Sequence, residues 1–101
     1  MAADVVMSMR WAEVTTEQYD TVRDAVDWEE LPAAGGQLHV AWFDEQGLHV
    51  IDVRESQQAF ETFLAERLAP ALQKAGIPGA PETSFSPLHR RFIAPGITGA
   101  A

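Results

Sequence analysis

The sequence predicts one α+β domain in which two helices cover one face of a four-stranded antiparallel sheet. Four segments carry apolar residues at every second position or in short β-branched runs, and two carry them at every third or fourth position. Their order along the chain is β-α-β-β-α-β. The 101 residues suit one domain, and 47% hydrophobic residues are enough for a core. We therefore assign residues 1–93 to a single domain and residues 94–101 to a flexible C-terminal tail.

The first strand and the first helix are expected in the N-terminal third of the chain. Alternation over residues 4–14 predicts a strand. Its apolar side consists of Val5, Met7, Met9 and Trp11. Thr15 and Gln18 have the spacing of a capping box, in which each side chain accepts a hydrogen bond from the other residue's backbone N–H. A helix is therefore expected over residues 16–28.

Two β-rich runs joined by a short turn predict a β-hairpin. The strands cover residues 37–43 and 48–54. A type I turn followed by a left-handed Gly47 would place His49 opposite Phe43. In that register His39 and His49 share one face of the sheet. A slip of one residue would place the two histidines on opposite faces.

The remaining elements are a second helix and a last strand. Apolar residues at spacings of three and four predict a helix over residues 57–75 that ends at Gly76. Pro70 lies inside this helix and should kink or break it, because proline removes a backbone donor. The last strand is expected over residues 82–93. Pro87 within it indicates an edge position or a bulge.

This order of elements is that of a ferredoxin-like sandwich. Two helices can cover only one face of such a sheet, yet the hairpin strands carry apolar residues on both faces. An exposed apolar face of this size implies a partner. We therefore expect a homodimer in which two sheets pack face to face and form an α/β barrel.

Charge and composition exclude several classes of function. The formal net charge of −8 argues against nucleic acid and anionic membranes as partners. Cysteine is absent, so neither a disulfide nor a thiolate metal site can form. The three histidines lack the spacing of a metal site, and no Gly-rich phosphate loop follows a strand. Apolar runs stay far below the roughly 20 residues of a membrane span. We expect a cytoplasmic protein without metal or cofactor.

The segment from Val53 to Phe60 resembles a strand-to-helix junction of the dimeric α/β-barrel superfamily. The closest likeness is to the antibiotic-biosynthesis-monooxygenase-like (ABM-like) proteins, which often show Glu-Ser-x-x-Ala after an aromatic residue. Glu55, Ser56 and Ala59 match that pattern. The segments 67–72 and 75–78 look like those of small actinobacterial members.

Two departures from the family pattern bear on chemistry. Arg54 replaces the aromatic residue before Glu-Ser, and the predicted helix over residues 57–75 lacks the histidine that haem-binding members commonly use. The resemblance therefore implies a cofactor-free protein. Cofactor-free oxygenases of this superfamily act on electron-rich polyketide rings in an apolar cavity.

The candidate site residues all lie on the hairpin. His39 and His49 are candidate catalytic bases, because imidazole titrates near neutral pH. For either histidine taken alone, the favoured explanation is an ordinary hydrogen-bonded residue on a half-buried sheet. Asp52 and Arg54 share a strand face and could grip a polar group of a ligand or form a structural ion pair. Phe43 is assigned to the contacts with an apolar ligand.

Strand parity forces a choice between these residues. Because the helices cover one face, we expect only residues on the other face to reach a cavity in the dimer. The predicted register puts the histidine pair on one face and Asp52 with Arg54 on the other, and we favour the histidine pair for the cavity.

Two functions of different classes follow. The first is a cofactor-independent monooxygenase or isomerase acting on an aromatic or polyketide-like molecule, with His39 or His49 as base and Arg54 stabilising enolate charge. The second is a homodimer that binds a small apolar ligand without catalysis or is purely structural. An open cavity in which His, Asp and Arg side chains converge would favour the enzyme.

Overall fold

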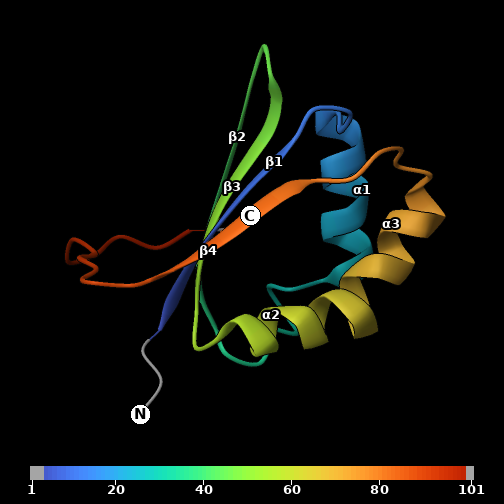
Figure 1. The fold of residues 1–101 in the computed structure, drawn as a ribbon. Coiled ribbons are helices and arrows are strands. Elements are labelled where there is room, and N and C mark those ends of the chain that lie inside the picture. Colours follow the sequence, from blue (N-terminus) through green and yellow to red (C-terminus); the bar gives the residue numbers. More distant parts are fainter. Residues whose placement is uncertain (1–3, 100–101) are drawn as a thin grey trace.

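A computed structural model describes residues 4–99 of the chain. It contains a four-stranded antiparallel sheet with the strand order β2-β3-β1-β4, which confirms the ferredoxin-like topology. The helices all lie on one face of this sheet (Figure 1). The strands are β1 (Val5–Trp11), β2 (Gly36–Asp44), β3 (Gly47–Arg54) and β4 (Glu82–Pro87). The helices are α1 (Thr16–Val26), α2 (Gln57–Phe63), a π-helical segment (Leu64–Leu68) and α3 (Ala69–Ala75).

Helix α1 begins with the predicted capping box. The backbone N–H of Gln18 donates to Thr15 Oγ1 at 3.2 Å, and the backbone N–H of Thr15 donates to Gln18 Oε1 at 3.0 Å. The helix ends at Val26, two residues earlier than predicted, because Asp27 turns into the left-handed region with φ 58°. This turn sends the chain into the loop that carries Trp28.

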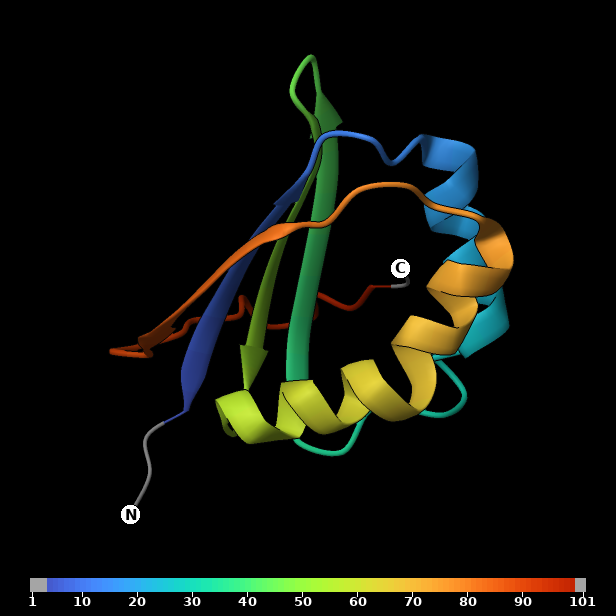
Figure 2. The same ribbon diagram turned by 45° about the vertical axis from the view of Figure 1, so that its right-hand side comes forward.

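The second helical run is continuous from Gln57 to Ala75 but changes type twice, whereas the sequence predicted a kink or a break into two pieces at its proline. Pro70 lies in the first turn of α3, where its missing N–H costs least. The π-helical segment precedes it, and the N–H of Ala69 bonds the carbonyl of Leu64. The run therefore bends around the sheet (Figure 2). Gly76 ends α3 with φ 67°, as predicted.

Strand β4 is an edge strand, as Pro87 predicted, but it is shorter than expected. It ends at Pro87 rather than at residue 93, because proline has no N–H with which to continue the ladder. Residues 88–99 continue without regular structure. The predicted tail, residues 94–101, lies only partly within the described residues.

The hairpin register differs from the prediction by one residue. Asp44 pairs with Gly47, so the turn has two residues, and His39 lies opposite Asp52 rather than Val53. The prediction placed the extra bulge residue at Gly47; the irregularity instead lies between Gly36 and Leu38, at the other end of β2.

The side chain of Asp44 closes the tight turn. Its Oδ1 accepts from the backbone N–H of Gln46 at 2.8 Å. Gly47 has φ 103°, and a Cβ there would lie 2.7 Å from the carbonyl oxygen of Trp11. The turn is therefore held by a local hydrogen bond and by contact with β1.

The two faces of the sheet have different environments. The face toward the helices is covered by them, and its buried apolar residues include Met7, Met9, Trp11, Leu48 and Val50. The opposite face carries a stripe of exposed apolar side chains on β2. Leu38, Val40 and Trp42 are 37%, 46% and 44% exposed. Within residues 4–99, no helix has the length and apolar character needed to cross a membrane.

Candidate functional site

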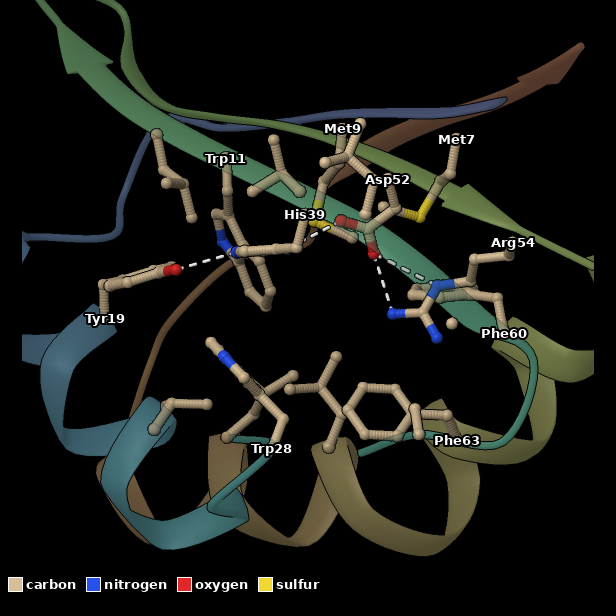
Figure 3. Close-up of a pocket in the computed structure, with 18 of the residues that line it drawn as sticks. Met7, Met9, Trp11, Tyr19, Trp28, His39, Asp52, Arg54, Phe60 and Phe63 are labelled. Atoms are coloured by element: carbon tan, nitrogen blue, oxygen red, sulfur yellow. Dashed lines mark hydrogen bonds and ion pairs between the residues drawn. The ribbon is translucent and has the colours of Figure 1, made fainter. Parts of the chain in front are cut away.

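A cavity of about 250 Å³ lies between the helix-facing side of the sheet and the helices (Figure 3). Most of its wall is apolar, with Met7, Met9, Trp11, Trp28, Phe60 and Phe63 among its lining. Its exposed lining residues are Pro32, Gly36, Gln37 and Leu38. The cavity therefore opens at the start of β2, beside the loop that follows α1.

This position corrects a prediction. We expected a cavity only on the face that the helices leave uncovered. The cavity instead lies on the face that the helices cover. There the loop carrying Trp28 and the bent helical run do not pack directly against β2 and β3 and leave space between the two layers. The cavity thus belongs to a single chain.

Four polar side chains form a continuous chain of hydrogen bonds along the cavity. The Tyr19 hydroxyl lies 2.7 Å from His39 Nε2, and His39 Nδ1 lies 2.6 Å from Asp52 Oδ1. The other oxygen of Asp52 accepts from Arg54 Nη2 at 2.7 Å and from Nε at 3.1 Å. Figure 3 shows Tyr19 at one end of this row and Arg54 at the other.

The corrected register brings these residues together. His39 is directly opposite Asp52 across the β2–β3 ladder. Arg54 is two residues further along β3 and therefore points to the same face. Tyr19 reaches His39 from the first turns of α1, which the capping box fixes in place. Sequence analysis placed Asp52 and Arg54 correctly together, but it separated them from His39.

Asp52 and Arg54 form an ion pair that is removed from solvent. They are 2% and 7% exposed. Burial of either charge alone would be costly, and the pair satisfies both oxygens of the carboxylate together with His39. The guanidinium carbon also lies 5.0 Å from the ring centre of Phe60 and 4.9 Å from that of Phe63. The negative faces of these aromatic rings attract the guanidinium cation and stabilise its orientation.

One nitrogen of this pair has no partner. Arg54 Nη1 is buried and makes no hydrogen bond. Buried polar groups are nearly always paired, so this nitrogen is an exception that carries a cost in stability.

Tyr19 keeps its proton over the whole neutral range. Burial, followed by the negative charge of Asp52, raises the pKa of its hydroxyl from 10.0 to about 12. The protonated hydroxyl donates to His39 Nε2, so we assign the proton of the imidazole to Nδ1, which donates to Asp52. The arrangement resembles a base that a carboxylate orients.

His49 lies on the opposite face of the sheet, away from the cavity. Its Nε2 is 2.9 Å from Asp44 Oδ1, and its ring stacks on Trp42 with 5.0 Å between ring centres. The hydrogen bond from His49 is the main reason that the pKa of the Asp44 carboxyl lies below its usual value. The predicted pairing of His39 and His49 on one face is therefore wrong.

Phe43 shares the helix-facing side with His39 but supports the site from behind. Its ring meets the Tyr19 ring edge-on, with 6.2 Å between centres. The cavity wall, as far as residues 4–99 form it, does not include Phe43.

Two further residues of the site, Tyr19 and Trp28, are not among the candidate residues chosen from the sequence. The rings of both lie against His39, at 6.1 Å and 5.2 Å between centres. One available signal was that Tyr19 is the single tyrosine of the chain and follows a strong helix cap.

No metal centre is evident in the described part of the chain. Among residues 4–99, no three His, Asp or Glu side chains come close enough together to hold an ion.

No protein-family model matches this sequence, and no curated protein does so either. Solved structures do match over most of the chain. A dimeric ferredoxin-like protein of unknown function from Thermobifida fusca has a TM-score of 0.61 at 16% identity, over 87% of this chain and 93% of its own. SnoaB, a cofactor-independent oxygenase from Streptomyces nogalater, has a TM-score of 0.57 at 14% identity, over 94% and 99%.

A monooxygenase from the gene ActVA-Orf6 of Streptomyces coelicolor, solved with the ligand nanaomycin D, has a TM-score of 0.54 at 19% identity, over 92% of this chain and 93% of its own. Proteins assigned to antibiotic biosynthesis monooxygenases are also among the structural neighbours, in agreement with the resemblance seen in the sequence. At these identities the likeness shows a shared fold, and the chemistry must be argued from the site.

Proposed function

We propose that this protein is a cofactor-independent monooxygenase that acts on a small ring-containing molecule with an acidic hydroxyl. One observation carries the proposal: the hydrogen-bonded row of Tyr19, His39, Asp52 and Arg54 runs along an otherwise apolar cavity. Such a site combines a base, a group that orients it and a donor for negative charge. The oxygenases among the structural neighbours make this class of reaction a reasonable expectation for the fold.

The first step is removal of a proton from the substrate. His39 is the base, and Tyr19 occupies its reactive nitrogen. The substrate hydroxyl gives its proton to the Tyr19 oxygen while Tyr19 passes its own proton to His39 Nε2. Asp52 then stabilises the imidazolium that forms.

The second requirement is stabilisation of the substrate anion. Arg54 lines the cavity, so its positive charge can stabilise an oxygen on which negative charge develops. Because the surrounding wall is apolar, this interaction is stronger than it would be in water.

Oxygen chemistry without a cofactor requires that the substrate supply every electron. An electron-rich phenolate gives one electron to O₂, and the resulting superoxide and ring radical combine to a hydroperoxide. Loss of water from it leaves a quinone, so one oxygen atom enters the product and the other leaves as water. The phenol, oxidised to the quinone, is the only reductant.

The cavity limits the size of the substrate. Its volume is about 250 Å³. An engineered cavity that binds benzene has a volume of about 150 Å³. We therefore propose a substrate of one or two fused rings.

We propose in addition that the protein is a homodimer. The stripe of Leu38, Val40 and Trp42 leaves an apolar sheet face that a second copy would cover. A dimeric neighbour of the same fold supports this arrangement. Most of the cavity lies on the other side of the sheet. Leu38 belongs both to the stripe and to the cavity mouth, so the second copy would lie beside that mouth.

The second candidate is a protein that binds such a molecule without converting it. It is supported by the internal pairing of His39 and Asp52, which are hydrogen-bonded without any ligand. Binding without oxygen uptake would identify this function.

Oxygen consumption with 1,5-dihydroxynaphthalene tests the proposal. We expect uptake of O₂ matched by formation of the hydroxylated naphthoquinone, at a rate that His39→Gln lowers by at least about 100-fold. His49→Gln is the matched control on the opposite face and should keep the wild-type rate. Uptake that is no faster than in buffer, or equal rates for both variants, would contradict the proposed function.

A further inference from the structure

We propose that Arg67 is a positioning residue for the Tyr19–His39 pair and acts through the loop that carries Trp28. Arg67 lies on the π-helical segment, and its Nη2 donates to the backbone carbonyl of Val26 at 2.8 Å. The two residues are 41 positions apart, so this bond joins the bent helical run to the end of α1. The inference rests on the proposed function for its catalytic meaning, because Tyr19 and His39 transfer the proton there.

The carbonyl of Val26 lies at a point where the chain changes direction. Val26 is the last residue of α1, and the final carbonyls of a helix have no partner within it. Asp27 then turns into the left-handed region and directs the chain toward Trp28. A guanidinium group at this end of a helix satisfies a carbonyl and is favoured by the helix dipole. Arg67 therefore fixes the loop where it leaves α1, two residues before Trp28.

The π-helical segment sets the direction of the Arg67 side chain. A π-helical turn holds more residues than an α-helical turn, because its bonds join each residue to the fifth one after it. The bond from the N–H of Ala69 to the carbonyl of Leu64 is of this kind and spans Arg67. The guanidinium carbon of Arg67 lies 5.3 Å from the ring centre of Phe63, and that of Arg54 lies 4.9 Å from the same centre. Phe63 therefore holds Arg67 beside the cavity wall.

Trp28 connects the fixed end of the loop with the Tyr19–His39 pair. Its ring centre lies 5.2 Å from that of His39 and 6.0 Å from that of Tyr19, which it meets edge-on. The same ring packs against the buried cluster that includes Val26 and Phe63. Figure 3 shows Trp28 and Phe63 on the helix side of the cavity and His39 on the strand side. A loop released at Val26 would carry the Trp28 ring away and admit water to the Tyr19 hydroxyl.

Tyr19 gives a readout that requires no substrate, because it is the single tyrosine of the chain. Burial is the main cause of its raised pKa, followed by the charge of Asp52, so access of water should lower that pKa. Arg67→Met keeps a long side chain beside Phe63 but removes the donor to Val26. We expect the midpoint of tyrosinate absorbance to fall from about 12 toward 10.0, by at least about one pH unit. The variant retains the other charged groups that act on the hydroxyl, which are Arg23, Asp20 and Glu29.

A second readout works at neutral pH, where alkali does not threaten the fold. The NMR signals of the Tyr19 ring depend on the rings of Trp28 and Phe43 beside it. In Arg67→Met these signals should move toward those of an exposed tyrosine. Arg10→Met is the matched control, because it breaks an ion pair on the open face, and it should keep both wild-type readouts. Unchanged Tyr19 signals in Arg67→Met would overturn the inference, even if this variant unfolds more easily, because a purely structural role predicts that result.

A double variant tests the route through the loop. Trp28→Leu removes the ring, so it should lower the Tyr19 midpoint by itself, and adding Arg67→Met should then lower it no further. A further fall of equal size would show that Arg67 acts on Tyr19 by another route and would overturn the inference. Arg67→Gln shortens the side chain instead and carries the same expectations where Arg67→Met does not fold.

Failure of the oxygen measurement is distinguishable from failure of this one. Neither readout uses a substrate or O₂, so absence of oxygen uptake would contradict the proposed reaction and leave the positioning of Tyr19 intact. Unchanged Tyr19 readouts beside normal oxygen uptake would contradict only the role of Arg67.

Discussion

The two faces of the β2–β3 hairpin carry one histidine each, and the two histidines have entirely different surroundings. His39 faces the helices and bonds a tyrosine and an aspartate that is 2% exposed. His49 faces away, bonds the exposed Asp44 and stacks on a tryptophan that is 44% exposed. Strand parity, rather than residue type, decides which histidine faces the cavity.

The comparison extends to the ion pairs. Asp52 is shared between two cations in a water-poor site, where removal of one partner leaves a buried charge. Asp44 lies at an exposed turn, where water replaces a lost partner. Substitutions on the helix-facing side should therefore lower the free energy of unfolding strongly. Substitutions on the open side should change it little but should weaken association of the two copies.

The largest expected effect is on the buried pair. Asp52→Ala leaves Arg54 without its counter-charge, so we expect the free energy of unfolding to fall by about 3–5 kcal/mol. His49→Ala on the opposite face of the same strand should cost no more than about 1 kcal/mol. Urea unfolding of both variants at one protein concentration measures the difference, and similar losses would abolish the contrast between the faces.

The next effect concerns association through the open face. Trp42→Asp places a charge in the apolar stripe, so we expect the dimer dissociation constant to rise by at least about 30-fold. Light scattering at micromolar concentration should then show a species of 11.1 kDa in place of twice that mass. Gln58→Asp adds the same charge on the helix side as a control. A dimer that tolerates Trp42→Asp would have to use another surface.

The smallest effect concerns the hydroxyl of Tyr19. Its pKa is about 12 in the folded chain against 10.0 when exposed, so its contribution to stability is complete below pH 10 and is lost as the pH rises toward 12. Tyrosinate absorbance reports this residue alone, because the chain has one tyrosine. We expect a midpoint near 12 in buffer and near 10 in urea. A midpoint near 10 in buffer would mean that Tyr19 is not buried against Asp52.

Local signals predicted most of the fold. The capping box at Thr15 and the bend at Pro70 depend on hydrogen bonds within a few residues, so the sequence contains their cause. The hairpin and the edge position of β4 were confirmed for the same reason.

The register and the cavity depended on contacts distant in sequence. Gly47 packs against the backbone of Trp11 and Ala12, which favours the two-residue turn, and no local pattern encodes that approach. The one-residue error moved His39 to the wrong face. The space beneath the sheet depends on how the loop carrying Trp28 and the bent helical run pack, which spacing alone does not determine.

The three tryptophans provide the most direct test of the central claim, that the ligand site lies on the helix-facing side. Trp11 and Trp28 line the cavity, and Trp42 lies on the open face. Each indole N–H gives its own signal in a heteronuclear NMR spectrum of the labelled chain. On addition of 1,5-dihydroxynaphthalene without O₂, we predict shifts for the Trp11 and Trp28 signals and none for Trp42. A shift confined to Trp42, or no shift at all, would contradict the claim.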